Sequence, residues 1–247
     1  MADTPNRVRI TIGSSQGAVP TPESIQKPRI ALAGKPAERS QAAALDLVFV
    51  IDSTGSMSDK IDALKSMCER FVDDLARSSI SYRAAIVAFG DLTVTGDKIS
   101  KTPFTTDVRT IKTLLQKLPT NSGGGNAGES SFEAIQAAQR LPFQQKCIKV
   151  LVLMTDEPAL QHNLTWTAIQ QSLVADGILL FAFATSDHYY KSFAQATGGS
   201  WWDIDSARSL DAVLSALTKL AASVTKTVTN VARLAGGDVK KYLQLDR

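Results

Sequence analysis

The sequence has few of the residues that build several common kinds of site. Its 247 residues include two cysteines and two histidines. Two cysteines do not make a disulfide framework, so we expect a reducing compartment, with Cys68 and Cys147 as small buried apolar residues. His162 follows a strand and could lie near a site, but the pattern is more typical of an ordinary surface histidine.

The sequence also lacks a strong excess of charge and a long apolar run. Its 27 basic and 24 acidic residues leave a net charge of +3, too balanced for a nucleic-acid-binding domain. No apolar run approaches the roughly 18 residues that span a bilayer. The first residues, MADTPNRVRITIG, lack the apolar stretch of a secretory signal. We therefore expect a cytoplasmic protein with no membrane span.

The two ends of the chain differ from its middle. Residues 1–44 hold five of the nine prolines, so we predict an N-terminal extension or linker, in which 7–12 or 28–34 could add a strand. Residues 227–247 are expected to form a C-terminal tail. This tail is either a helix that docks on a neighbouring element or a solvated terminus, and we expect the solvated terminus.

Between these ends, residues 45–226 alternate apolar strands with amphipathic helices and form the predicted domain. Strands are predicted at 45–51, 81–90, 147–155, 178–185 and 200–204, with a short edge strand at 102–105. Helices are predicted at 58–78, 107–118, 130–141, 164–176, 188–199 and 207–226. Ser58 is expected to cap the first helix, and Gly177 to end the fourth. This order predicts a three-layer αβα domain with a doubly wound, mostly parallel, Rossmann-like sheet.

Oxygen-bearing side chains follow the predicted strands, at the edge where such sheets bind ligands. They come after the strands at 45–51 and 147–155 and from the Gly-rich loop at 119–131. The candidate metal ligands are Asp52, Thr54, Ser56, Asn126 and Asp156. Carboxylates and hydroxyls suit Mg²⁺, with Mn²⁺ or Ca²⁺ as alternatives, better than Zn²⁺ or copper. We expect the two hydroxyls to bind directly and the two aspartates to bind through water.

The segment DSTGS at 52–56 resembles the D-x-[ST]-x-S motif of von Willebrand factor type A (VWA) domains, where it forms the metal-ion-dependent adhesion site (MIDAS). The resemblance covers about residues 45–225. It includes a GGGN loop at 123–126 and the LMTDEP segment at 153–158. It implies the same ligand set, except that Asn126 stands where the family usually has Thr or Asp. An amide oxygen can coordinate or hold a water, but it brings no charge.

Five residues around the predicted site are expected to meet a partner. These candidate contacts are Ser53, Gly125, Glu129, Glu157 and Tyr189. Tyr189 is included because tyrosine is enriched in interfaces, although core packing of Tyr189 or Tyr190 is an equal alternative. Glu129 matches an acidic residue of the family's loop, although it could instead cap the following helix.

The function that this resemblance implies is a metal-dependent protein-binding module, and not an enzyme. A partner's Asp or Glu would supply the last ligand of the ion. We expect an intracellular scaffold or adaptor, since bacterial members of the family often work beside AAA-type ATPases, kinases or phosphatases.

Two alternatives stay open. One is a Mg²⁺-dependent phosphatase or hydrolase with Asp52 as nucleophile, although Thr54 replaces the second aspartate of the D-x-D pattern. The other is a metal-free structural interaction domain, which Asn126 favours. A nucleotide-binding site is not indicated, because no P-loop motif follows the first strand.

Overall fold

The computed structural model describes residues 44–245, except 79, 126–127, 162 and 207–208. The chain divides into two units, 1–38 and 39–247. The strands expected at 7–12 and 28–34 lie outside the described residues, so the description below concerns the second unit.

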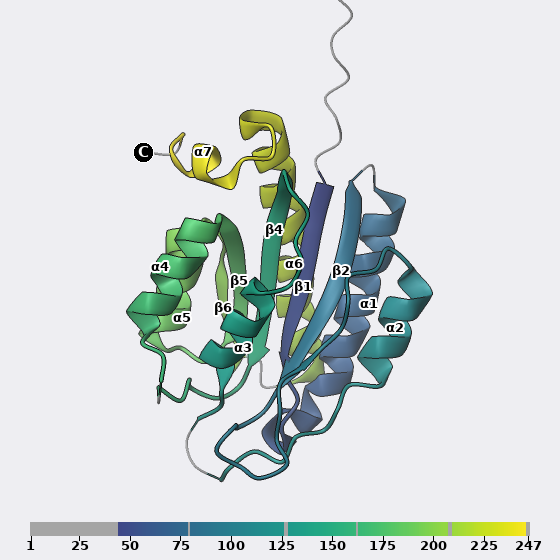
Figure 1. The fold of residues 1–247 in the computed structure, drawn as a ribbon. Helices are drawn as coiled ribbons and strands as arrows, with labels where there is room; N and C mark the ends of the chain where they lie inside the picture. Colours follow the sequence, from purple (N-terminus) through teal and green to yellow (C-terminus); the bar gives the residue numbers. More distant parts are fainter. Residues whose placement is uncertain (1–43, 79, 126–127, 162, 207–208, 246–247) are drawn as a thin grey trace, which may run out of the picture. The chain divides into compact units, whose positions relative to one another are not determined.

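A single sheet of mostly parallel strands forms the middle layer (Figure 1). Its strands are β1 Ala44–Asp52, β2 Ser81–Phe89, β3 Ser100–Lys101, β4 Cys147–Thr155, β5 Ile178–Ala184 and β6 Trp201–Asp203. They lie in the order β3-β2-β1-β4-β5-β6, and only β3 is antiparallel to its neighbour. The winding changes direction between β1 and β4, which places the switch point of the sheet at their carboxyl ends.

The short edge strand lies earlier in the chain than predicted. The ladder with β2 covers Ser100–Lys101, and Thr105 adds only an isolated bridge to Ala84. Pro103 has no N–H to donate, which interrupts the ladder between these two points.

Helices cover both faces of the sheet. They are the 3₁₀ helix η1 Gly55–Asp59 and the α-helices α1 Ile61–Arg77, α2 Val108–Gln116, α3 Ser131–Gln139, α4 Trp166–Asp176, α5 His188–Thr197, α6 Leu210–Ala235 and α7 Val239–Leu243. One apolar core joins the sheet to α1, α2, α6 and α7, and a second joins it to α3, α4 and α5 (Figure 1). This arrangement confirms the predicted three-layer αβα fold.

Strand β1 shows why both faces are covered. Phe49 and Ile51 belong to the first core, whereas Val48 and Val50 belong to the second. Side chains alternate between the faces of a strand, so a continuous apolar run requires helices on both sides. Strand β1 is thereby held between helices on both faces, in the centre of the strand order.

The start of α1 differs from the prediction. Ser58 lies within η1, and α1 begins at Ile61 after Lys60, so the prediction that Ser58 caps this helix was wrong. The buried side chain of Met57 anchors η1 to the first core, which separates the turn from the helix. By contrast, Gly177 ends α4 in the left-handed conformation (φ 63°), as predicted.

The C-terminal segment packs more extensively than predicted. Helix α6 does not end at 226 but continues to Ala235. Val228, Val231 and Val239 are buried in the first core, so the expected solvated terminus was wrong. The apolar stripe of α6 continues past 226 at helical spacing, and burying this stripe keeps the segment docked. None of the described helices combines the length and the apolar character that crossing a membrane requires.

Candidate metal site at the carboxyl edge of the sheet

Asp52 ends β1 and is fully buried. Its Oδ1 accepts hydrogen bonds from the Thr54 backbone N–H (3.0 Å) and the Thr54 hydroxyl (2.6 Å), and its Oδ2 accepts one from the Thr155 hydroxyl (2.7 Å). All three donors are neutral, and Asp52 forms no ion pair among the described residues. Burial raises the pKa of Asp52, while the bonds from Thr54 and Thr155 oppose that rise.

A continuous chain of oxygen atoms connects Asp52 to Asp156. The Thr54 Oγ1 lies 3.1 Å from the Ser56 Oγ, and the Ser56 hydroxyl donates to Asp156 Oδ1 at 2.8 Å. The structure therefore brings together four of the five predicted ligands, although Asp156 follows a different strand. The fifth, Asn126, lies outside the described residues.

Lys60 also reaches this group, and sequence reasoning missed it. Its Nζ lies 3.2 Å from Asp156 Oδ2 and 3.0 Å from Asp59 Oδ1. Spacing along the chain gave no signal for the pair of Lys60 with Asp156. This pair depends on which strand end faces the turn between η1 and α1.

Glu129 lies beside the site with an unsatisfied carboxylate oxygen. Its side chain is buried, and Oε2 has no hydrogen-bond partner among the described residues. Burial, together with the charges of Asp52 and Asp91, raises the pKa of Glu129 to about 8. Helix α3 begins at Ser131, and no side-chain bond caps it. The alternative of a helix cap is therefore not what the described residues show.

A second aspartate–threonine pair follows β2, in the segment FGDLT, and sequence reasoning missed it as well. Asp91 Oδ1 accepts hydrogen bonds from the Thr93 N–H (2.8 Å) and hydroxyl (2.6 Å), as Asp52 does from Thr54. Asp91 is buried, and its Oδ2 has no partner among the described residues. The signal that could have found it is a D-x-T motif directly after an apolar strand.

Asp97 fixes the Gly-rich loop next to the site. Its carboxylate accepts hydrogen bonds from the backbone N–H of Ser122 (2.7 Å) and Gly123 (2.9 Å). Burial alone would raise the pKa of Asp97, but these backbone donors hold it below its usual value. A charged carboxylate thus holds the loop, because its oxygens accept backbone N–H groups that would otherwise lack partners.

Two of the predicted partner contacts are buried. Ser53 donates to the Phe89 carbonyl (3.2 Å), and the Tyr189 hydroxyl accepts from the Ala159 N–H (2.7 Å). The Tyr189 ring also packs edge-on against Phe132, with 5.2 Å between ring centroids. Direct partner contact by Ser53 and Tyr189 was therefore a wrong prediction, because both side chains are buried and form hydrogen bonds within the chain.

The other predicted contacts have different surroundings. Gly125 is exposed and Glu157 is partly exposed, so their contact with a partner stays a prediction. Glu129 is buried, so it faces the site and not the open surface.

The donor set fits a hard divalent cation. It consists of two carboxylates and two hydroxyls joined by short contacts, with the unpartnered oxygen of Glu129 close by. Among the described residues, no cluster of three or more His, Cys, Asp or Glu side chains has the arrangement of a metal site. A site built half from hydroxyls does not depend on such a cluster, and Mg²⁺ accepts hydroxyl and water ligands.

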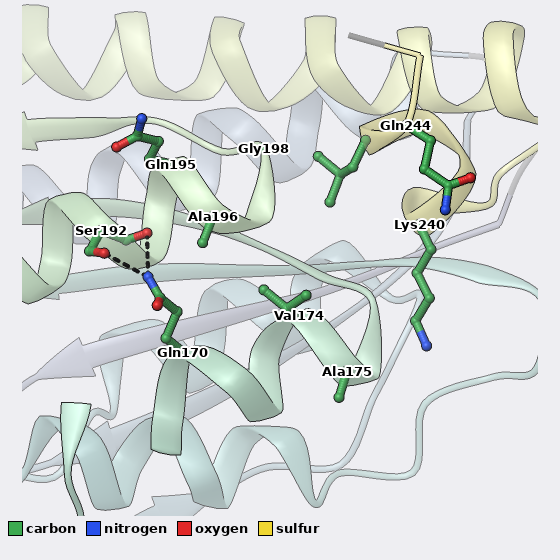
Figure 2. A pocket seen from close by; sticks show the side chains of 10 residues that line it. Gln170, Val174, Ala175, Ser192, Gln195, Ala196, Gly198, Lys240 and Gln244 are labelled. Atoms are coloured by element: carbon green, nitrogen blue, oxygen red, sulfur yellow. Dashed lines mark hydrogen bonds between the residues drawn. The ribbon is translucent and has the colours of Figure 1, made fainter. Parts of the chain in front are cut away.

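A large hollow of about 890 Å³ lies away from this site, between α4, α5 and α7 (Figure 2). Gln170 lies on one side of it and donates to the Ser192 carbonyl (3.1 Å) and hydroxyl (2.6 Å). Val174 and Lys240 are among the other residues that line it. The four candidate metal ligands that the structure describes do not line this hollow.

Comparisons with known proteins agree with the fold described above. The sequence model of the von Willebrand factor type A domain matches residues 46–201. No curated protein matches the chain. Among solved structures, the pilus adhesin SpaC from Lactobacillus rhamnosus GG, in its open conformation, is similar with a TM-score of 0.57 and 16% identity. The match covers 76% of this chain but only 30% of the adhesin, so it supports the fold alone.

Proposed function

Because this chain belongs to the von Willebrand factor type A domain family, whose members generally mediate protein interactions, we propose that it is a metal-dependent protein-binding module. In this proposal a Mg²⁺ ion binds at the carboxyl edge of β1 and β4. The side chain of a partner's Asp or Glu completes the coordination of that ion.

The observation that carries the proposal is the burial of the Asp52 carboxyl group without a cationic partner among the described residues. Asp52 is fully buried, and among the described residues it accepts hydrogen bonds from neutral donors only. Glu129 beside it has a buried oxygen without a partner among the described residues. Buried charges are normally paired or coordinate metals, so a cation from solution is the simplest source of the missing charge.

The chain's own residues have distinct tasks in this proposal. Thr54 and Ser56 offer hydroxyl oxygens directly, because they lie between the two aspartates in the chain of contacts. Asp52 and Asp156 hold water ligands and orient the two hydroxyls. When bound, the ion supplies an open coordination position for a carboxylate oxygen, and Mn²⁺ or Ca²⁺ could take the place of Mg²⁺.

The enzymatic alternative finds little support in the geometry. An aspartyl nucleophile needs a free oxygen that a substrate can reach. Both oxygens of Asp52 accept hydrogen bonds, and the residue is fully buried. We propose that the protein has no catalytic activity and works as an intracellular scaffold or adaptor. An AAA-type ATPase, a kinase or a phosphatase remains the partner class that we expect.

Metal titration by calorimetry tests the site directly. Ser56→Ala removes a proposed ligand, and Ser58→Ala is its matched control, because both serines are exposed on η1. We expect Ser56→Ala to weaken Mg²⁺ binding at least about tenfold and Asp52→Asn to abolish it, with Ser58→Ala unchanged. Equal heats for the wild type and Asp52→Asn would reject the metal site and favour a metal-free interaction domain.

A pull-down tests whether the ion takes part in partner binding. The wild-type protein, Ser56→Ala and Ser58→Ala are each exposed to a cell lysate, with Mg²⁺ or with EDTA. We expect a partner that is retained by the wild type and Ser58→Ala in Mg²⁺ and is lost with EDTA or with Ser56→Ala. A partner that survives both changes uses another surface.

A further inference from the structure

We propose that Lys60 is a built-in counter-ion for Asp156 that lowers the affinity of the site for divalent cations. This inference rests on the proposed function and adds a residue outside the predicted ligand set. The Lys60 Nζ lies 3.2 Å from Asp156 Oδ2, and the side chain of Lys60 is only 18% exposed. That of Asp156 is 8% exposed, so water screens this pair less than it screens a surface ion pair.

The carboxylate of Asp156 is fully engaged by the chain itself. Its Oδ1 accepts a hydrogen bond from the Ser56 hydroxyl at 2.8 Å, and its Oδ2 faces the ammonium of Lys60. Asp59 binds the same ammonium at 3.0 Å and helps to hold it there. An ion that uses Asp156 must share this carboxylate with Lys60.

The backbone keeps Lys60 at this position. Its N–H donates to the Met57 carbonyl (2.9 Å), and its own carbonyl accepts from the Leu64 N–H (3.0 Å). Lys60 is thereby fixed at the junction between η1, which carries Ser56, and α1. The ammonium is part of the same local structure as the proposed hydroxyl ligands.

The two aspartates of the site are consequently neutralised in different ways. Asp156 has a cation from its own chain, whereas Asp52 has none among the described residues. An ion held by Ser56 would lie close to the ammonium, since Ser56 and Lys60 contact the same carboxylate, that of Asp156. Like charges repel, so removal of the ammonium should raise the affinity for a divalent ion by about 3- to 10-fold at moderate salt.

Calorimetric titration with Mg²⁺ and Mn²⁺ tests this role. Lys60→Met removes the charge and keeps most of the side-chain length, and Lys60→Gln is a second uncharged variant. Lys60→Arg keeps the charge. Lys65→Met is the matched control, because Lys65 also belongs to α1, is partly buried and forms no ion pair among the described residues.

We expect Lys60→Met and Lys60→Gln to bind both ions about 3- to 10-fold more tightly than the wild type. Lys60→Arg and Lys65→Met should stay within about twofold, because the former keeps the local charge and the latter changes only the net charge. The increase in melting temperature on adding Mg²⁺ should be larger for Lys60→Met than for the wild type, as an independent readout.

Several outcomes would overturn the inference. Unchanged or weaker binding by both uncharged variants would mean that Lys60 positions Asp156 and does not compete with the ion. An equal gain in ion affinity for Lys65→Met would mean that the effect comes from the net charge of the protein and not from the position of Lys60. If the wild type binds the ion but Lys60 variants match it, only this inference fails. If neither the wild type nor any variant binds an ion, the proposed function fails and the inference fails with it.

Discussion

Strand β1 carries a buried aspartate near each end, and the two have opposite surroundings. Asp46, near the amino end, is fully buried and receives two hydrogen bonds from Arg83, through Nε (2.9 Å) and Nη2 (2.6 Å). The Gln144 backbone N–H adds a third bond at 2.7 Å. Asp52, at the carboxyl end, is equally buried, but within the described part of the chain it receives bonds only from the neutral groups of Thr54 and Thr155.

We interpret this difference as one between a structural carboxylate, Asp46, and a carboxylate of the proposed metal site, Asp52. At the amino edge the chain supplies its own guanidinium, that of Arg83. Its fork geometry matches a carboxylate, so it neutralises Asp46 without an external cation. Arg83 is held further by the Phe104 ring, 4.6 Å from the guanidinium carbon. At the carboxyl edge Asp52 lacks such a partner among the described residues, and the missing charge can come from outside the chain.

Replacing the guanidinium should have the largest effect. Arg83→Met leaves Asp46 buried without a counter-ion, so we expect the free energy of unfolding to fall by about 3–5 kcal/mol. Urea denaturation followed by circular dichroism measures this loss. The double variant Asp46→Asn/Arg83→Met should recover part of it, because the buried charge is gone. A loss below about 1 kcal/mol would contradict the view that Arg83 compensates Asp46.

Surplus negative charge at the carboxyl edge should appear as a pH dependence. The pKa of Glu129 is raised from 4.5 to about 8, so between these values the folded protein holds a proton that the unfolded chain has released. The free energy of unfolding, measured with EDTA present, should therefore fall as pH rises from 5 to 8. We expect Glu129→Gln to remove about 1–3 kcal/mol of this fall.

The control for this experiment is Asp62→Asn, which removes an exposed carboxylate on α1. It should leave the pH dependence as in the wild type. If Glu129→Gln and the wild type lose the same stability between pH 5 and 8, then Glu129 is ionised throughout and the surplus charge lies elsewhere.

Removing one neutral donor from Asp52 should have the smallest effect. Thr155→Val deletes the hydroxyl that binds Asp52 Oδ2 at 2.7 Å, and we expect a loss of about 1–2 kcal/mol in chelator. Thr229→Val, at an exposed position on α6, should change stability by less than about 0.5 kcal/mol. A neutral result for Thr155→Val would show that the carboxylate does not depend on this donor.

The predictable part of the molecule followed from local pattern. The apolar run at 45–51 required cover on both faces, and the alternation of strands and helices then left few topologies. The proximity of Thr54 and Ser56 to Asp52 was predictable because both lie within a few residues of a strand end. Gly177 was found because a left-handed residue commonly ends a helix.

The errors arose where a side chain's role depended on a distant segment. Tyrosine is enriched in protein interfaces. In this structure, however, the Tyr189 hydroxyl accepts a hydrogen bond from the Ala159 N–H, and its ring packs on α3. No role was predicted for Lys60, because its partner Asp156 lies 96 residues away in the sequence. The length of α6 was underestimated because its last apolar residues stabilise the helix only by packing into a core formed by distant segments.

The sequence by itself determined the layers, the order of the elements and the grouping of oxygen-bearing side chains after β1, because hydrophobic period and chain spacing are local properties. Only the tertiary structure decided which charges are neutralised within the chain. Asp46, Asp52 and Asp156 look alike in the sequence, but Arg83 reaches the first and Lys60 the third, while the second receives only neutral donors among the described residues. Charge compensation acts over a few ångströms in space, and the folding of distant segments onto one edge sets those distances.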